Sequence, residues 1–199
     1  NQQVIRLAIR VPRRIYVAVS GGVDSMAALS FLNGNHDVTA AFFDHGTESS
    51  HEAKSFLSDY CANLSISLVT AKLEGVKPPG LSLEEHWRNQ RYDFLTKLDG
   101  TVVTAHHLDD AVETWVWSSM HGKPKLPSLS RDNIIRPFIT TRKSELLDWC
   151  LRTGVPWIED RSNQDTRFTR NYIRKELIPH CLRVNPGLHK MIKKKYAQG

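Results

Sequence analysis

Ser20-Gly21-Gly22-Val23-Asp24-Ser25 follows an apolar stretch, residues 15–19, that reads as a β-strand. Two adjacent glycines allow a sharp turn and let backbone N–H groups approach a ligand. We expect a helix to begin near Ser25, with its unpaired amides and the positive end of its dipole directed at the same place. The hydroxyls of Ser20 and Ser25 add further donors. The stretch therefore predicts an anion-binding loop between a strand and a helix.

The carboxylate of Asp24 in this loop indicates a divalent cation held between the protein and bound phosphates. The chain has neither the Gly-x-Gly-x-x-Gly pattern nor Gly-x-x-x-x-Gly-Lys-Ser/Thr, so the loop belongs to another kind of nucleotide site. Ser-Gly-Gly-x-Asp-Ser after a strand resembles the signature of the PP-loop ATP pyrophosphatases. These enzymes split ATP into AMP and pyrophosphate and hold the pyrophosphate in this loop. The alternative is a glycine-rich turn between a strand and a helix.

Five apolar stretches read as strands and alternate with segments of helical periodicity. They are residues 15–19, 38–43, 66–70, 101–104 and 134–136. This alternation predicts an α/β fold, with a doubly wound, mostly parallel five-stranded sheet and a small helical C-terminal appendage. At 199 residues the chain is long enough for one domain and an appendage. We assign residues 1–140 to an ATP-binding α/β domain and residues 141–199 to a basic helical tail that completes the site.

Polar clusters follow two of the predicted strands, at the edge where open α/β sheets bind ligands. Asp44-His45-Gly46 follows residues 38–43, and His106-His107-Leu108-Asp109-Asp110 follows residues 101–104. A helix start needs only one capping aspartate, whereas two carboxylates and two imidazoles gather here. We therefore expect Asp110 to bind a metal ion or a phosphate.

A helix predicted to begin after Ser82 carries Glu84, Arg88 and Arg91 on one face. Arg88 and Arg91 are candidates for contacts with a ligand. The alternative is a set of surface ion pairs worth only a few tenths of a kcal/mol.

Positive charge is concentrated near the C-terminus. Residues 1–135 carry 13 Lys and Arg against 15 Asp and Glu, whereas residues 136–199 carry 14 against 6. A basic region joined to a nearly neutral nucleotide-binding body suggests a polyanionic partner, and nucleic acid is the common one. The alternative is a solvated basic face.

The cysteines indicate a reducing compartment. Cys61, Cys150 and Cys181 are scattered, without the paired spacing of disulfide, zinc or iron–sulfur frameworks. No apolar run approaches the roughly 20 residues that cross a bilayer. We therefore expect a cytoplasmic protein with no membrane partner.

Taken in order, the motifs resemble those of the catalytic N-terminal domain of the tRNA(Ile)-lysidine synthases. The resemblance covers nearly the whole chain, and its last motif distinguishes this family from other PP-loop enzymes. After the loop at residues 20–25, the motifs are Asp44-His45-Gly46, Glu84-x3-Arg88-x2-Arg91-Tyr92, Thr104-Ala105-His106-His107-x-Asp109-Asp110-x2-Glu113-Thr114, Arg136-Pro137, Arg142-x2-Glu145-Leu146, and Trp157-x2-Asp160-x-Ser162-Asn163-x-Asp165-x2-Phe168-x-Arg170-Asn171-x2-Arg174.

The resemblance implies an ATP-dependent ligase that joins free L-lysine to C2 of the wobble cytidine in tRNA(Ile) with a CAU anticodon. It implies ATP and Mg²⁺ as cofactors, with Asp24 and Asp110 holding the metal ion. It makes Glu113 or Asp160 the base, while Arg136, Arg170 and Arg174 face phosphates or the lysine carboxylate. The residues implied to bind the nucleotide are Ser20, Gly21, Gly22, Val23, Asp24, Ser25, Asp44, His45, Arg88, Arg91, His106 and Arg136.

Two alternatives to this function stay open. One is another PP-loop enzyme of tRNA modification, such as a cytidine 2-thiolating enzyme, although that chemistry favours cysteine pairs that the chain lacks. The other is an inactive nucleotide- or RNA-binding module with the same fold, because a fold does not by itself imply an activity.

Overall fold

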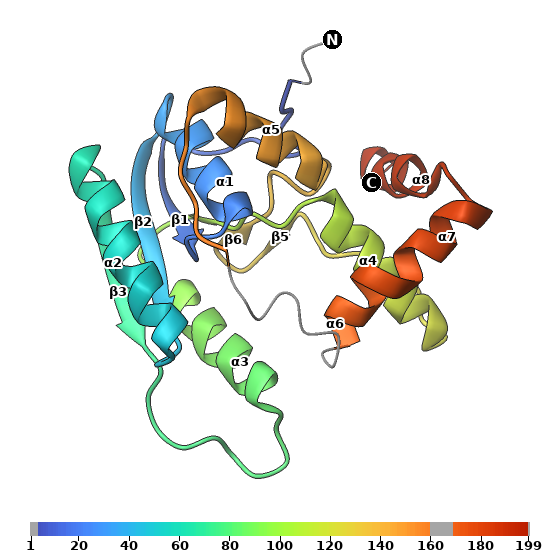
Figure 1. Cartoon of the computed structure of the whole chain (residues 1–199), viewed down its shortest axis with the longest axis horizontal. Helices are drawn as coiled ribbons and strands as arrows, with labels where there is room; N and C mark the ends of the chain where they lie inside the picture. Colours follow the sequence, from blue (N-terminus) through green and yellow to red (C-terminus); the bar gives the residue numbers. More distant parts are fainter. Residues whose placement is uncertain (1–3, 160–168, 199) are drawn as a thin grey trace.

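A computed structural model describes residues 4–159 and 169–198, and its centre is one mixed sheet (Figure 1). The strands lie in the order β3-β2-β1-β4-β6-β5, and all neighbours are parallel except β5 and β6. Their bounds are β1 Arg14–Val19, β2 Asp37–Asp44, β3 Ser67–Lys72, β4 Val102–Val103, β5 Ser130–Arg131 and β6 Ile134–Ile135. The predicted α/β class and its five parallel strands are confirmed.

The sixth strand, β5, was not predicted, since its residues were expected to lie in a loop or to precede the last strand. It pairs with β6 through a two-residue turn, in which Asp132 has a left-handed φ of 54°. Aspartate tolerates this conformation better than most residues, and such turns join antiparallel strands. A strand of two residues shows no alternation of polar and apolar side chains, so the pattern gave no signal for it.

Helices cover both faces of the sheet, as expected of a doubly wound fold. Successive side chains of β1 alternate, so Ile15, Val17 and Val19 pack against one helical layer, whereas Tyr16 and Ala18 face the other. The first layer consists of α1, α2 and α5, and the second contains α3. Their bounds are α1 Val23–Asn33, α2 Glu48–Asn63, α3 Leu83–Thr96 and α5 Lys143–Thr153.

The C-terminal helices pack on α4 (Leu108–Met120), away from the main core (Figure 1). Leu188 and Ile192 of α8 join Leu108 and Val112 of α4 in a separate apolar cluster. The helices after residue 168 are α6 Thr169–Tyr172, a π-helical turn Ile173–Leu177, α7 Ile178–Val184 and α8 Leu188–Ala197. Since α5 packs on α1 within the main core, the layered structure includes residues beyond 140. The division into 1–140 and 141–199 stays a prediction.

Glycine at the end of α5 provides a test of local backbone strain. Gly154 has φ 68°, and a Cβ added there would meet no atom within 4 Å. Backbone strain at this positive φ is therefore the main cost of adding a side chain at position 154. We expect Gly154→Ala to lower the free energy of unfolding, measured by urea denaturation, by about 1 kcal/mol. The control is Gly34→Ala at the end of α1, where φ is −67° and alanine should be neutral or stabilising. Equal losses in both variants would contradict this explanation.

Candidate active site

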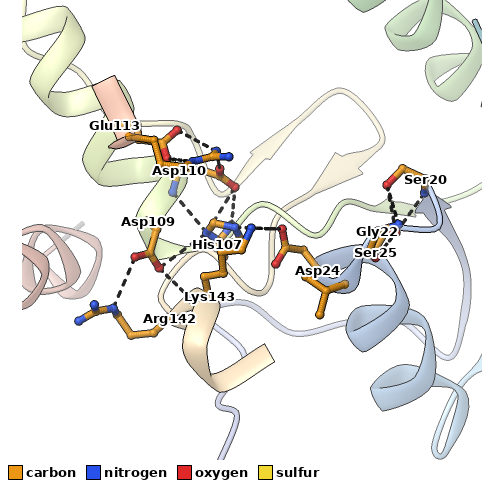
Figure 2. Close-up of polar contacts among 12 residues, drawn as sticks. Ser20, Gly22, Asp24, Ser25, His107, Asp109, Asp110, Glu113, Arg142 and Lys143 are labelled. Carbon is orange, nitrogen blue, oxygen red and sulfur yellow. Dashed lines mark hydrogen bonds and ion pairs between the residues drawn. The ribbon is translucent and has the colours of Figure 1, made fainter. Parts of the chain in front are cut away.

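The loop between β1 and α1 has the geometry of an anion site (Figure 2). Gly21 has φ 85°, and Gly22 is the N-cap of α1, with no side chain capping the helix. The amides of the first turn are thus available to a ligand. The Ser25 hydroxyl donates to the carbonyl of Gly22 over 3.1 Å and accepts from the amide of Ser20 over 3.0 Å, which fixes the turn. α1 begins at Val23, two residues before the predicted start, so Asp24 lies within its first turn.

The segment after α5 packs directly against this loop. The amide of Ile158 donates to the carbonyl of Gly21 over 2.9 Å, and a Cβ on Gly21 would come within 2.9 Å of the Ile158 side chain. Glycine is therefore required at position 21 both by its positive φ and by this close approach. Although residues 160–168 lie outside the described part of the chain, the segment that leads into them forms one wall of the loop.

A cavity of about 490 Å³ opens beside the loop, a size typical of small-molecule sites. The loop residues Ser20 and 22–25 line it, together with His45 after β2 and Arg91 of α3, whereas Gly21 is not part of the lining. Lys143 at the start of α5 and Arg174 of the π-helical turn supply two further positive charges. The cavity thus combines cations and backbone donors with the carboxylates of Asp24, Glu52 and Glu159, at the carboxyl edge of the sheet where parallel folds bind ligands.

Asp24 is held by two groups that the sequence motifs had not assigned. Its Oδ2 lies 3.3 Å from Nε2 of His107 and 3.4 Å from Nζ of Lys143 (Figure 2). Burial alone would raise the pKa of Asp24, but the hydrogen bond from His107 and the charges of His107 and Lys143 outweigh it and lower that pKa. Asp24 is therefore ionised at neutral pH.

His107 connects Asp24 to the start of α4. Its ring is only 2% exposed, and its Nδ1 accepts the amide of Asp110 over 3.3 Å while the Asp110 carboxylate accepts the amide of His107 over 3.0 Å. Because Nδ1 is an acceptor in this capping box, the proton of the neutral ring is on Nε2 and is donated to Asp24. Burial opposes a charge on His107, but the carboxylates of Asp110, Asp24 and Asp109 raise its pKa.

Asp109 joins three helices beneath this cluster. Its Oδ2 accepts the amide of Lys143 over 2.7 Å, and its Oδ1 lies 3.0 Å from Nε2 of His189 on α8. The guanidinium of Arg142 lies 3.8 Å from the same Oδ1. Asp109 thus has a positioning role: it fixes the start of α5, and with it the Lys143 side chain that reaches Asp24.

Glu113 and Arg174 form a two-point ion pair behind Asp110. Nε and one terminal nitrogen of Arg174 lie 2.6 and 3.1 Å from the two carboxylate oxygens of Glu113, and the same terminal nitrogen lies 3.6 Å from Asp110. Glu113 is 8% exposed, and this burial raises its pKa more than the charge of Arg174 lowers it. Arg174, the partner of Glu113, lines the cavity beside the loop, which is called the nucleotide cavity below. A carboxylate of raised pKa in this position is suited to accept a proton.

A second cavity, of about 520 Å³, lies on the other side of Glu113. Arg88, Lys125 and Arg170 line it, and so do Glu84, Glu85 and the half-exposed indole of Trp117. Arg174 lines the first cavity and Glu113 the second, so their ion pair separates the two spaces. Arg88, expected to bind the nucleotide, lies in the second cavity rather than beside the loop.

The remaining predicted nucleotide ligands have mixed positions. His45 and Arg91 line the first cavity, as expected, whereas Asp44, His106 and Arg136 are absent from the lining of both cavities. Asp44 accepts the amide of Gly46 over 2.8 Å, which shapes the turn after β2, and Arg136 donates to the carbonyl of Ser128 over 3.0 Å. Burial lowers the pKa of His106 to about 4, and its Nδ1 lies 2.8 Å from the Thr104 hydroxyl. Asp160 lies outside the described residues.

Asp24 fits the chemistry of Mg²⁺, whereas Asp110 stays a predicted ligand, because its Oδ2 accepts the amide of His107 and its Oδ1 lies 3.6 Å from Arg174. Oδ1 of Asp24 is buried and has no hydrogen-bond partner among the described residues, which leaves it available to a cation. Within residues 4–159 and 169–198, no three His, Cys, Asp or Glu side chains are grouped as a complete metal centre. Mg²⁺ is commonly held by one or two carboxylates together with substrate phosphates and water, so a complete protein centre is not required.

A glycine loop at the carboxyl edge of a parallel sheet, with carboxylates from the neighbouring strand end beside it, defines a nucleotide-binding α/β protein. The chain belongs to the PP-loop domain family, which matches residues 2–181. Among the described residues, none of the helices has the length and apolar character needed to span a lipid bilayer.

Curated relatives share the name tRNA(Ile)-lysidine synthase, so the resemblance drawn from the motifs is confirmed. The protein from Thermotoga sp. (strain RQ2) is 34% identical over 190 residues, which cover 86% of this chain and 46% of that protein. The protein from Staphylococcus epidermidis (strain ATCC 35984) is 33% identical, with 91% and 47% covered. That from Vibrio vulnificus (strain YJ016) is 32% identical, with 89% and 44% covered. The chain spans about half the length of these relatives.

Solved structures agree with the fold. NMN synthetase from Francisella tularensis has a TM-score of 0.52 at 16% identity, covering 84% of this chain and 77% of that chain. NH3-dependent NAD synthetase from Campylobacter jejuni has a TM-score of 0.50 at 14% identity, covering 94% and 85%. At these identities the likeness concerns the fold alone.

Proposed function

We propose that this chain is the catalytic part of a tRNA(Ile)-lysidine synthase, a ligase that uses ATP to join L-lysine to C2 of the wobble cytidine in a CAU-anticodon tRNA. One observation carries the proposal: the Glu113–Arg174 pair stands between the nucleotide cavity and a second cavity of mixed charge, which also holds the indole of Trp117. This arrangement suits a reaction in which a nucleotide in the first cavity and an RNA base in the second approach the Glu113–Arg174 pair from two sides. The names of the relatives support the choice of substrate.

The proposed reaction has two steps. The C2 oxygen of cytidine first attacks the α-phosphate of ATP, which releases pyrophosphate into the loop at residues 20–25 and makes AMP a leaving group. The ε-amine of lysine then attacks C2, and AMP departs. Mg²⁺, held by Asp24 and Asp110, would neutralise phosphate charge. Lys143 and Arg174 line the same cavity and add fixed positive charge where negative charge develops.

The second step needs a proton acceptor, because the ε-amine of lysine has a reference pKa of about 10.4 and is charged at neutral pH. Glu113 is the described carboxylate that suits this role, since it is buried and its pKa is raised. Arg174 would hold Glu113 in place and stabilise phosphate charge. Asp160 stays a second candidate for the base.

Thiol chemistry is a poor fit to this site. Cys61 and Cys150 are buried, and burial raises the pKa of both thiols, that of Cys150 to about 11. Both thiols are thus protonated at neutral pH, whereas thiolation requires a thiolate. This disfavours the 2-thiolating alternative. Three free cysteines also agree with the proposed cytoplasmic location.

The proposal is tested by incubating the protein with ATP, Mg²⁺, lysine and a CAU-anticodon tRNA(Ile). Lysidine is measured by mass spectrometry of the digested tRNA, and pyrophosphate release is followed in parallel. The initiator methionine tRNA, which has the same anticodon, is the matched control. We expect lysidine only in tRNA(Ile). Binding of ATP and tRNA without pyrophosphate release or lysidine would favour the inactive-module alternative.

The basic tail is proposed to bind the tRNA backbone. Lys193 and Lys194 are exposed on α8, and Arg170 lines the second cavity, whereas Arg167 lies outside the described residues. The salt slope is the slope of the logarithm of the binding constant plotted against the logarithm of the salt concentration. Each phosphate that the protein neutralises contributes roughly −0.7 to −0.9 to this slope. We therefore expect Lys193→Gln with Lys194→Gln to make the salt slope shallower for matching and unrelated tRNAs alike.

Salt titrations of tRNA binding by the wild-type and doubly substituted proteins measure this slope. The control replaces Lys54 and Lys97, exposed or half-exposed lysines elsewhere on the body, by glutamine. An unchanged slope in the α8 variant would show that this part of the tail is a solvated face.

A further inference from the structure

The nucleotide cavity has an aromatic wall, of which the sequence motifs assigned only His45 to the nucleotide. Phe43 at the end of β2, His45 in the loop after it, and Trp87 on α3 all line this cavity. The ring of His45 lies 5.1 Å from that of Phe43 and 5.1 Å from that of Trp87, measured between centroids. The three rings thus form a continuous, largely apolar surface beside the phosphate-binding loop.

Sheet order places this wall on one side of the loop and the charged cluster on the other. The loop follows β1, whose neighbours are β2 and β4. His45 follows β2, whereas His107 and Asp110 follow β4. A ligand whose phosphates lie in the loop can place its nucleoside on the β2 side, which leaves Asp24 and Lys143 free to act at the phosphates. A purine base suits an aromatic surface, because its faces stack on aromatic rings.

The indole of Trp87 carries a buried donor without a partner. Its Nε1 is inaccessible to solvent and makes no hydrogen bond to any described residue. A buried N–H without an acceptor is costly, so such groups normally have a partner in the working state of the protein. Arg91, four residues further along α3, lines the same cavity, which shows that this face of the helix is directed at the site.

We propose that Trp87 binds the adenosine part of ATP: its ring completes the aromatic wall, and a small rotation of the indole brings its buried N–H to an acceptor on the nucleoside. This inference rests on the proposed use of ATP and adds a residue that determines affinity for the nucleoside. It assigns the phosphates to the loop and the nucleoside to α3, so the two parts of the ligand can be tested separately.

The test compares Trp87→Phe with the wild-type protein by calorimetric titration with ATP and with inorganic tripolyphosphate, both in Mg²⁺. Phenylalanine keeps an aromatic ring but removes the N–H. We expect about tenfold weaker binding of ATP and unchanged binding of tripolyphosphate. Trp87→Ala should weaken ATP binding by roughly another tenfold, because the stacking surface is lost as well. The matched control is Trp115→Phe, whose ring lies on α4 under Lys195, outside the cavity.

Several results would overturn the inference. These are wild-type affinity of Trp87→Phe for ATP, an equal loss for ATP and tripolyphosphate, or no binding of ATP by the wild-type protein. Circular dichroism and urea denaturation verify that each variant folds, and Trp87→Phe carries the test if Trp87→Ala does not. Neither tRNA nor lysine is present, so a failure to form lysidine would contradict the proposed function without affecting this result.

Discussion

Replacing Asp24 or Asp110 by asparagine should lower the rate of pyrophosphate release at least about 100-fold while the protein stays folded. Asparagine keeps the size of the side chain and one oxygen acceptor, so the capping of α4 by residue 110 can persist. It removes the negative charge that a cation requires. Phosphate charge would then develop without compensation, and the barrier of the first step would rise.

The measurement is pyrophosphate release at saturating Mg²⁺, with urea denaturation as the test of folding. The control is Asp148→Asn on α5, where the carboxylate makes only a half-exposed ion pair with Arg152 over 2.8 Å. That variant should retain wild-type activity. If Asp24→Asn and Asp110→Asn also release pyrophosphate at near wild-type rates, the two carboxylates do not hold a catalytic metal ion.

The loop and the strand ends could be predicted because their signals are local. A strand, two glycines and a helix start are adjacent in the sequence, and their physical meaning does not depend on the rest of the chain. The same is true of the start of α3, which was predicted to follow Ser82: the hydroxyl of Ser82 caps this helix by accepting the amide of Glu85 over 3.1 Å.

The partners of Asp24 could not be predicted, because they depend on packing between distant elements. Lys143 is 119 residues away in sequence and reaches Asp24 only because α5 packs on α1. The assignment of Arg88 to the nucleotide illustrates the same limit. Arg88 and Arg91 are three residues apart on one helix, yet the first lines the second cavity and the second lines the nucleotide cavity.

The position of Arg174 depends on an irregular turn that no periodicity reveals. The sequence predicted only that the tail is helical, whereas Ile173–Leu177 form a π-helical turn within it. Pro179 follows this turn. Proline has no backbone N–H to donate to the preceding turn, and its ring crowds the carbonyl group of that turn. Widening the helix relieves that conflict, and such turns are frequent at functional sites. The widened turn carries the guanidinium that holds Glu113.

Glu113→Gln should separate the two steps of the proposed reaction. Glutamine still accepts a hydrogen bond from Arg174 but cannot take a proton from the lysine amine. We expect lysidine formation to fall by roughly 100- to 10,000-fold, whereas pyrophosphate release in the first step stays within about tenfold of wild type. Adenylated tRNA should accumulate. The control is Glu176→Gln, an exposed carboxylate in the same π-helical turn as Arg174, which should change neither step.

The pH dependence of the second step gives an independent readout. A base acts when it is deprotonated, so its contribution is lost as pH falls through its pKa. Burial, only partly offset by Arg174, raises the pKa of Glu113, and the loss should therefore begin at a higher pH than for an ordinary glutamate. Glu113→Gln should lack this dependence when lysine transfer is followed from preformed adenylated tRNA. If the variant slows both steps equally and keeps the wild-type pH profile, Glu113 only positions Arg174, and Asp160 becomes the candidate base.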